Sequence, residues 1–370
     1  MSLARDLADL GSSATRTAGS NNKNMIINGA MNVAQRATSA TGLGGSFGYF
    51  VCDRWRSGGG STAGRFTMTQ ESDGPSGFAN CTKLACTTAD TSIAAGESLS
   101  FQQVIEGQDL QRIGKGTSDA KEITFSFYAK ANAAATYTAE LFDANNSRQI
   151  SKTFSVTTAW TRVSLTYPAD TTGAFTDSNA AALYIIIWLH AGSDVTSGTL
   201  NSTSWAANVE ANRVSSSQTS FLDSTARTFF ITGVQLEVGD TATDFEHRSF
   251  GDELQACQRY YQKSFEYGTA VGSSTQLGSW STGGHQGGTT TGYIEGAIIF
   301  EQHMRATPTL TIYDHSGNSG KSARLAAGVA RYQNENVALS QTSSRGSFLN
   351  SASGTAAGIV QAHYTADAEL

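Results

Sequence analysis

Residues 123 to 129 read Ile-Thr-Phe-Ser-Phe-Tyr-Ala, an alternation of apolar and more polar side chains. Successive side chains of a β-strand point to opposite faces, so Ile123, Phe125 and Phe127 share one face and can pack on a core. Similar stretches follow along the chain, at 154–156, 160–167 and 229–238. Residues 183–189 are apolar on both faces, which predicts a strand in the centre of a sheet.

The composition also favours strands over helices. The chain has 370 residues, of which 38 are glycine and only 15% are charged. Gly, Ser, Thr and Asn replace the Lys and Glu from which helices are usually built. Strands separated by Gly, Asn, Asp and Ser turns, with almost no helix between them, predict an antiparallel sandwich, most plausibly a jelly roll.

One helix is predicted after this sandwich. Phe250, Leu254, Cys257 and Tyr261 recur at helical spacing over 249–263, and Ser249 or Asp252 is available as a cap. A single helix with an aromatic-rich stripe fits a connector packed on a neighbouring domain or subunit. A second β-like region follows, with expected strands at 292–300 and 309–313.

The N-terminus predicts a second, shorter helix. Ser2 can cap residues 2–10, Leu3, Leu7 and Leu10 fall on one stripe, and Gly11 can end the helix. Residues 11–24 are small and polar, which is linker composition. The helix is either a frayed end or an attachment segment that docks on a larger assembly, and its isolation from any core favours attachment.

The expected organisation is thus an all-β chain with two helices. It comprises an N-terminal attachment helix and linker (1–24), an antiparallel jelly-roll domain (25–248), a connecting helix (249–264) and a C-terminal β-sandwich domain forming the distal tip (265–370). The last region has little to bury for its length. Copies that share apolar faces around a symmetry axis would stabilise it, so we expect a homotrimer.

Charge and targeting signals exclude several classes of protein. The net charge is −6 with no basic block, so nucleic-acid binding is not expected. No apolar run of signal-peptide length follows Met1, and the most apolar stretch, 180–190, is too short to cross a bilayer. We therefore expect synthesis in a cytoplasm. The four cysteines have no paired spacing and are expected to be free thiols rather than zinc ligands.

Catalysis is not expected. A glycosidase needs two carboxylates beside the bond, but Glu97, Glu106, Asp109 and Asp119 lie in a loop-rich stretch where acids are usually solvated. No GxSxG nucleophile elbow and no HExxH helix are expected, the six histidines are scattered, and no repeat suggests a β-helical depolymerase. The glycine runs at 42–45 and 58–60 lack a following Gly-Lys-Ser/Thr and indicate turns. No cofactor and no specific metal residues are predicted; calcium is possible, but 143–146 fits a simple hairpin turn.

Two aromatic groups are candidates for glycan recognition, which needs flat rings and planar polar groups. Tyr184, Trp188 and His190 share one face of the 183–190 strand and would form a sugar platform, which Tyr128 could join. The alternative is that this strand is simply central in the core.

Trp280 is the second candidate. It lies among Gly, Ser and Thr residues without obvious packing partners, and the adjacent 283–288 segment is a predicted loop tip. Exposed aromatic rings in such loops are common at recognition surfaces. The alternative is that Trp280 fills a seam between subunits.

Several motifs carry a family resemblance. The chain contains Asn-Gly-x-Met-x-x-x-Gln-Arg at 28–36, Asp-Arg-Trp at 53–55, Ile-Thr-Gly-Val-Gln-Leu-Glu-Val-Gly at 231–239, Cys-Gln-Arg-Tyr-Tyr at 257–261, Met-Arg-Ala-Thr-Pro at 304–308 and the terminal segment 364–370. These motifs resemble parts of tail fibres and related appendage proteins of tailed bacteriophages. The first two resemble the opening of a jelly roll, the third its last strand and the fourth the helix that follows. The last two resemble the C-terminal β domain. The jelly rolls of these proteins are of a carbohydrate-binding type.

The resemblance implies a virion component. It predicts a trimeric tail-fibre or appendage subunit that attaches to a host-surface glycan, contacts other phage structural proteins through its N-terminus, and inserts into no membrane. A purely architectural capsid decoration or head or tail spike is the alternative, and a polysaccharide depolymerase is a weaker one. In the Asp53-Arg54-Trp55 motif we expect a buried Trp55, with Arg54 held by a carboxylate such as Asp53 or Glu237.

Overall fold

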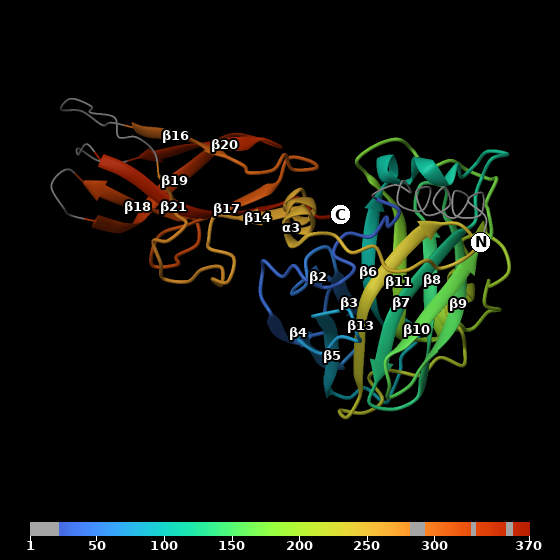
Figure 1. Ribbon diagram of the computed structural model, residues 1–370. Coiled ribbons are helices and arrows are strands. Elements are labelled where there is room, and N and C mark those ends of the chain that lie inside the picture. The colour runs from blue at the N-terminus through green and yellow to red at the C-terminus, as the bar shows by residue number, and fades with distance from the viewer. Residues whose placement is uncertain (1–21, 282–292, 327–330, 353–357) are drawn as a thin grey trace, which may run out of the picture.

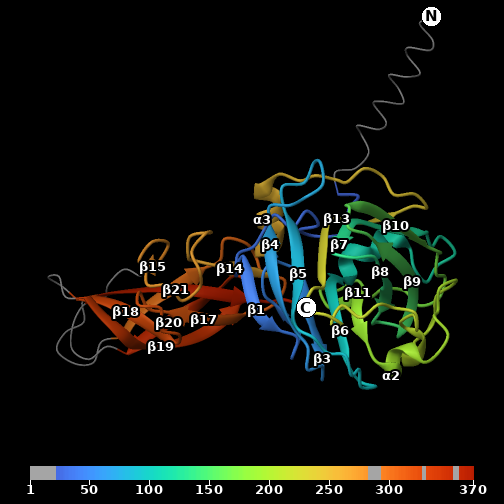
Figure 2. The same ribbon diagram turned by 90° about the horizontal axis from the view of Figure 1, so that it is seen from below.

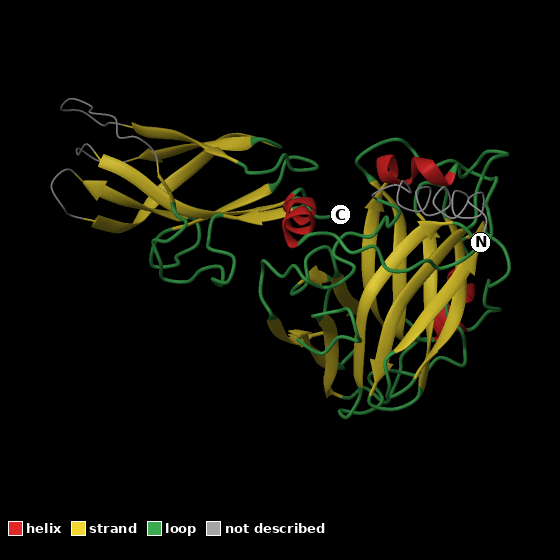
Figure 3. Ribbon diagram, viewed as in Figure 1, coloured by secondary structure: helices red, strands yellow, loops and turns green. Residues whose placement is uncertain are grey.

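The protein is built from three antiparallel β-sheets, and the all-β prediction is confirmed (Figure 3). The computed structural model describes residues 22–281, 293–326, 331–352 and 358–370. Two sheets pack face to face as a curled sandwich. The third sheet lies to one side, and helix α3 (Phe250–Gln258) sits at the junction, as two views show (Figures 1 and 2).

The first sheet of the sandwich has six strands. In spatial order they are β1 (Ser39–Leu43), β4 (Arg65–Glu71), β5 (Cys81–Thr88), β13 (Thr228–Val238), β7 (Ile123–Ala131) and β10 (Thr161–Tyr167). The predicted alternating stretch is β7, which pairs on one side with β10 and on the other with β13. Strands that are neighbours in space but distant in sequence are typical of a jelly roll.

The second sheet has seven strands. In spatial order they are β12 (Ala206–Ala207), β9 (Arg148–Val156), β8 (Ala135–Asp143), β11 (Ala181–Ala191), β6 (Ser98–Glu106), β3 (Arg56–Gly60) and β2 (Gly48–Tyr49). Strand β11 contains residues 183–189 and lies between β8 and β6, so the predicted central strand is confirmed. Residues 144–147 form the hairpin turn between β8 and β9, also as predicted.

The core lies between these two sheets because each contributes its apolar face. Phe125 and Phe127 from β7 are fully buried. Leu183 and Ile185 from β11 are fully or almost fully buried as well. Trp55 is also fully buried, and its ring stacks on Phe101 with centroids 4.8 Å apart. The sandwich therefore has a complete hydrophobic core within one chain.

The third sheet contains the C-terminal strands. Its main path is β14 (Tyr261–Lys263), β21 (Gly358–Asp367), β18 (Lys321–Ala326), β19 (Arg331–Ser343), β20 (Gly346–Ala352) and β16 (Tyr293–Ile299), and β15 (Trp280–Ser281) and β17 (Thr309–Tyr313) also pair with β21. Its buried cluster is smaller than that of the sandwich and includes Ile298, Ile312, Leu349 and Val360.

The connecting helix is shorter than predicted. Ser249 is its N-cap, since the Ser249 hydroxyl accepts a hydrogen bond from the backbone N–H of Asp252. The helix ends at Gln258, and Tyr261 does not continue its stripe. Tyr261 instead begins β14, because its backbone pairs with that of Asp367 in β21, near the C-terminus. Three further helical turns are short: η1 (Gly107–Ile113), α2 (Ser193–Thr196) and η2 (Glu210–Asn212).

The second glycine run was misread as a turn. Residues 58–60 belong to strand β3, which pairs with β6. A side chain at Gly59 would place its Cβ 1.6 Å from the carbonyl oxygen of Ser98, so the strands approach too closely for any other residue. Glycine here serves close packing within a sheet rather than chain reversal.

The last residues of the chain meet the Asp53-Arg54-Trp55 motif at the junction. The guanidinium of Arg54 binds the carboxylate of Glu369 and lies 3.5 Å from the ring centroid of Tyr260. Trp55 is buried as predicted, but the predicted partners of Arg54 were wrong. Asp53 accepts hydrogen bonds from Gln35, and Glu237 binds Gln235 and Thr243. The motif therefore anchors the C-terminus to the sandwich.

Some predictions lie outside the described residues. These are the N-terminal helix with Leu3, Leu7 and Leu10, most of the 11–24 linker, and the 283–288 loop tip. Within the described ranges, no helix combines the length and the apolar character needed to cross a bilayer.

Candidate functional site

The predicted platform begins on the outer face of the second sheet. Along β11, Leu183, Ile185 and Ile187 belong to the sandwich core, whereas Ile186 and Trp188 belong to a separate cluster with Val214. The alternation expected from the sequence is therefore present, with Tyr184 packed against the outer cluster. What covers this face decides whether it can bind a ligand.

Trp188 is covered by the segment that follows its own strand. Only 6% of Trp188 is exposed, and its indole N–H donates to Oε2 of Glu140 at 2.7 Å. Arg213 binds the same carboxylate at 2.9 Å and lies 5.1 Å from the Trp188 ring. Burial raises the pKa of Glu140, although Arg213 and Trp188 oppose this shift. Trp188 is thus part of a buried hydrogen-bond network with Glu140 and Arg213, and its ring has no free face for a sugar.

His190 is turned away from Trp188. The pairing of β11 with β6 shifts register between these two residues, and His190 is fully buried. Its ring nitrogens face Ser220 and Glu97. Burial lowers the pKa of His190. The structure therefore does not bring His190 into a platform with Trp188.

Tyr184 is the member of this group that keeps an accessible surface. It is half-buried, and its ring lies 6.0 Å from Phe142 and 5.2 Å from the guanidinium of Arg56. Arg56 also lies 5.4 Å from the exposed ring of Phe47 and binds the side-chain carbonyl of Gln102. This makes a small aromatic and guanidinium surface at the edge of the second sheet.

Tyr128 does not join that surface. It lies on β7 in the first sheet, whereas Tyr184 lies on β11 in the second. The half-buried Tyr128 ring packs 5.3 Å from Phe78, which in turn contacts Phe245 and the exposed His247. The prediction that Tyr128 extends the platform was wrong, because face alternation within one strand does not say which sheet the strand enters.

Trp280 has packing partners that the sequence did not suggest. It begins the short strand β15, pairs with Ala362 of β21, and donates its indole N–H to the carbonyl of Ala297 at 3.0 Å. Its half-buried ring packs against the core of the third sheet. It therefore borders a pocket near α3 instead of standing free in a loop.

This Trp280 pocket has a volume of about 410 Å³. Helix α3, β14 and its following loop, the end of β16 and β21 all contribute. Its wall consists of Gln35, Leu254, Gln258, Lys263, Ser264, Phe265, Glu266, Tyr267, Gly278, Trp280, Ile299, Glu301 and Tyr364. The volume lies within the range of roughly 300–1,000 Å³ that is usual for small-ligand sites.

The polar groups of the pocket are held in place. The Gln258 amide donates to Oε2 of Glu301 at 3.0 Å. The Lys263 ammonium donates to the backbone carbonyls of Tyr267 and Thr269 at 3.0 and 2.7 Å. Burial lowers the pKa of Lys263. The pocket thus combines four aromatic residues, Trp280 among them, with an amide, a carboxylate and an ammonium group in fixed positions.

Most of these pocket residues were not predicted as a site. Gln258 lies in the quoted 257–261 motif, but no signal connected it with Lys263, Glu301 or Tyr364, which come from other elements. The residues meet only because β14 and β15 both pair with β21.

Two of the four acids dismissed as solvated are buried. Glu106 is fully buried, and both of its carboxylate oxygens bind Arg259, at 2.8 and 3.3 Å. Glu97 is 7% exposed, whereas Asp109 and Asp119 are exposed as expected. Glu106 therefore joins the sandwich to the residue that follows α3.

Comparisons with known proteins find structural similarity only. The sequence matches no family model and no curated protein. A structure described as CBM4 aligns over 57% of this chain and 98% of its own, with a TM-score of 0.30 and 13% identity. A family 11 carbohydrate-binding module from Clostridium thermocellum aligns over 57% of this chain and 99% of its own, with a TM-score of 0.27 and 10% identity.

A phage protein is also among the structures found. The enzymatically active domain of tailspike protein 4 from bacteriophage CBA120 aligns over 59% of this chain but only 22% of its own length, with a TM-score of 0.30 and 14% identity. Alignments this weak assign neither fold nor function. The β-sandwich assignment rests on the strand pairing described above, and the chain is an all-β protein with a jelly-roll sandwich.

Proposed function

We propose that this chain binds a glycan in the Trp280 pocket. The observation that carries the proposal is the half-exposed Trp280 ring beside the amide of Gln258 and the carboxylate of Glu301 in one pocket. Sugars present apolar C–H faces that stack on aromatic rings, and hydroxyl pairs that planar amides and carboxylates bind. Fixed polar partners reduce the cost of ordering the site when a ligand binds.

The biological setting we propose is a tailed-phage particle. The quoted motifs resemble tail-fibre and appendage proteins, so the chain would be a virion subunit that attaches to a host-surface glycan and contacts other phage proteins through its N-terminus. It would hold and not cleave the glycan. We also propose that it is a homotrimer, in which several weak sites acting together raise the overall avidity.

Exposed apolar side chains support subunit contacts near the pocket. Among the described residues, seven large hydrophobic side chains are exposed, and four of them lie between 250 and 299. They are Phe250, Tyr267, Leu277 and Ile299. Leu277 and Ile299 are 71% and 77% exposed, which is unfavourable for an isolated chain and favourable at an interface or a ligand site.

The test is glycan binding by matched variants of the full chain. A glycan array with host polysaccharides should show binding by the wild type and at least tenfold weaker binding by Trp280→Ala. Trp160→Ala is the control, since Trp160 is also half-buried but packs against Phe230, far from the pocket. It should bind like the wild type.

Ile299→Lys is a second variant and is expected to fold like the wild type, because Ile299 lines the pocket with an exposed side chain. Loss of binding in both pocket variants supports the site. Unchanged binding in Ile299→Lys and Trp280→Ala, or loss only in Tyr184→Ala, contradicts it. Absence of binding even at high valency favours the architectural role, and release of reducing sugar ends would contradict a non-catalytic function. Sedimentation of the full chain tests the trimer.

A further inference from the structure

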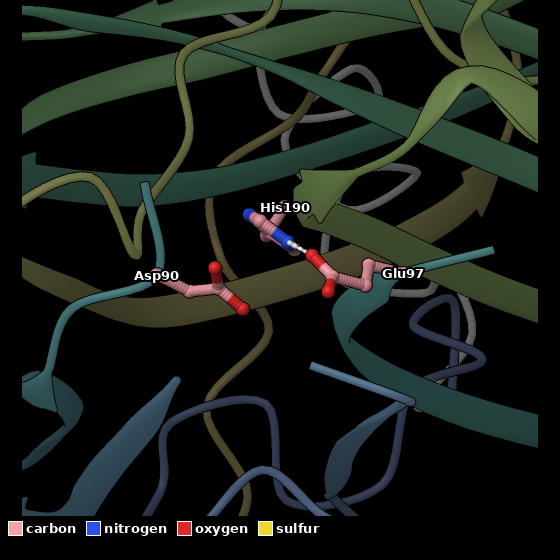
Figure 4. Close-up of side chains that lie close together, drawn as sticks. All are labelled: Asp90, Glu97 and His190. Carbon is pink, nitrogen blue, oxygen red and sulfur yellow. Dashed lines mark hydrogen bonds and ion pairs between the residues drawn. The ribbon is translucent and has the colours of Figure 1, made fainter. Parts of the chain in front are cut away.

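Three buried side chains converge at one end of the sandwich, outside the Trp280 pocket. Asp90 follows β5, Glu97 immediately precedes β6, and His190 lies near the end of β11. Their carboxylate oxygens and an imidazole nitrogen lie within 4.8 Å of one another, and Figure 4 shows all three groups directed toward a common point. Each of the three residues is buried.

A hydrogen bond on the side of the His190 ring away from the carboxylates fixes its orientation. Its Nδ1 lies 2.8 Å from the hydroxyl of Ser220, which leaves Nε2 facing the carboxylates. A histidine that binds a metal through one ring nitrogen generally hydrogen-bonds a second partner through the other. That partner sets the tautomer and the orientation of the ring. The register shift between Trp188 and His190 turns the ring into this position.

The carboxylate of Glu97 is nearly buried and faces His190. Only 8% of its side chain is exposed, and among the described residues Nε2 of His190, at 3.4 Å, is the partner of this carboxylate. Asp90 is better satisfied, since it accepts hydrogen bonds from Thr62, Ala63 and Ser92. Glu97 is therefore a nearly buried acid whose carboxylate lies within 4.8 Å of the ligand atoms of Asp90 and His190.

The charges of the cluster do not balance within the described part of the chain. No lysine or arginine there forms an ion pair with Asp90 or Glu97. With two carboxylates and one imidazole, the net charge is negative whichever protonation state His190 adopts. Buried charges in proteins are generally paired with an opposite charge or bound to a metal.

We propose that Asp90, Glu97 and His190 bind a divalent transition metal, with zinc as the preferred ion. Zinc accepts imidazole nitrogen and carboxylate oxygen at about 2.0–2.2 Å, which places adjacent ligands of a tetrahedron about 3.3 Å apart. The 3.4 Å separation between Nε2 of His190 and Oε2 of Glu97 already matches that edge. Asp90, whose carboxylate lies within 4.8 Å of the other two ligand atoms, moves closer to supply the third ligand, and water takes the fourth position.

The ion would tie together segments that are far apart in sequence. The backbone N–H of Asp90 binds the carbonyl of Leu222, and the N–H of Gly192 binds the carbonyl of Glu97. Backbone hydrogen bonds thus already link the loop of Asp90 to the segment that carries Ser220, and the end of β11 to Glu97. A metal bound only by the folded state stabilises that state in proportion to its affinity and concentration.

The experiment uses the full chain after dialysis against a chelator. Titration with zinc chloride, followed by calorimetry, should show about one ion per chain, and the melting temperature should rise with zinc concentration. Glu97→Gln should abolish both responses. It should also melt no lower than the metal-free wild type, because the substitution removes one of two uncompensated negative charges.

His363→Gln is the matched control. His363 is also fully buried, but its ring nitrogens face Ser264 and the carbonyl of Thr275, and no carboxylate of the described residues pairs with it. It should retain one zinc ion per chain. Ser220→Ala should weaken zinc binding roughly 10–100-fold, as loss of an orienting partner does.

Three results would overturn the proposal. The first is no stoichiometric zinc binding at micromolar concentration. The second is a zinc response that survives in Glu97→Gln, which would place the ion elsewhere. The third is a response to calcium but not to zinc, which would contradict an imidazole ligand. Glycan binding is measured separately and does not depend on any of these outcomes.

Discussion

Arg54 and Glu369 are separated by 315 positions in sequence, yet they form an ion pair in which both side chains are almost inaccessible, at 1% and 5% exposure. Arg54 also donates to the carbonyl of Val104 in β6. Glu369 is therefore bound to the sandwich through Arg54, and this contact attaches the third sheet to the sandwich just after β21.

Removing the carboxylate of Glu369 should be strongly destabilising. Glu369→Ala leaves the Arg54 guanidinium buried without its counter-charge, so the free energy of unfolding should fall by about 3–5 kcal/mol. Urea unfolding followed by fluorescence measures this. Asp223→Ala, which breaks the more exposed pair with Arg227, should cost at most about 1 kcal/mol. Equal effects of the two substitutions would contradict the inferred role of burial.

Asp53 should make a pH-dependent contribution of unusual sign. Burial raises its pKa from 3.8 to about 6, although Arg36 and Gln35 oppose the shift. The folded state then binds the Asp53 proton more tightly than the unfolded state does. Stability from this group is therefore present below about pH 4 and is lost as the pH rises through about 6.

The comparison of wild type with Asp53→Asn isolates that contribution from other acids. The unfolding free energy of the wild type minus that of the variant should increase as the pH falls from about 6.5 to 4. Chemical denaturation at several pH values gives this difference. A constant difference, or one that decreases on acidification, would show that the pKa of Asp53 is not raised.

Trp188→Ala should affect stability before it affects binding. Its ring is buried and its N–H binds Glu140, so truncation leaves a cavity and removes one of the donors to that buried acid, at a cost of about 3–5 kcal/mol. The melting temperature and the glycan affinity should be measured on the same preparation. A folded Trp188→Ala protein with normal stability and no glycan binding would restore Trp188 as a ligand residue.

The four thiols should be inert in the folded protein. All four cysteines are free and buried, and burial raises the pKa of both Cys52 and Cys81 to about 12. A thiolate is the reactive form, so Ellman's reagent at pH 8 should label none of them quickly, and all four after unfolding in guanidinium. One rapidly labelled thiol in the native protein would contradict this arrangement.

Periodicity in the sequence was sufficient to identify several of the strands. The alternation in 123–129 placed Phe125 and Phe127 in the core, and the two-sided apolar run placed β11 in the centre of a sheet. Ser249 was likewise recognisable as a helix cap. These features depend on local geometry, in which side-chain spacing alone fixes the buried face.

The candidate sites were predicted less well, because they depend on what covers each face. Trp188 and Tyr184 follow the same alternation, but the segment carrying Arg213 covers one and leaves the other half-exposed. Trp280 was correctly selected as an aromatic residue in a polar stretch, yet nothing local predicted its pairing with β21.

The sequence by itself determined that this protein is a β-sandwich with a terminal β region and a short connecting helix, since those properties follow from residue spacing and turn composition. Only the tertiary structure decided that Glu369 neutralises Arg54, that Glu97 is buried beside His190, and that Gln258 and Glu301 border the same pocket as Trp280. Each of these contacts joins segments that are distant along the chain. Their partners are chosen when the sheets close, and no local pattern of residues records that choice.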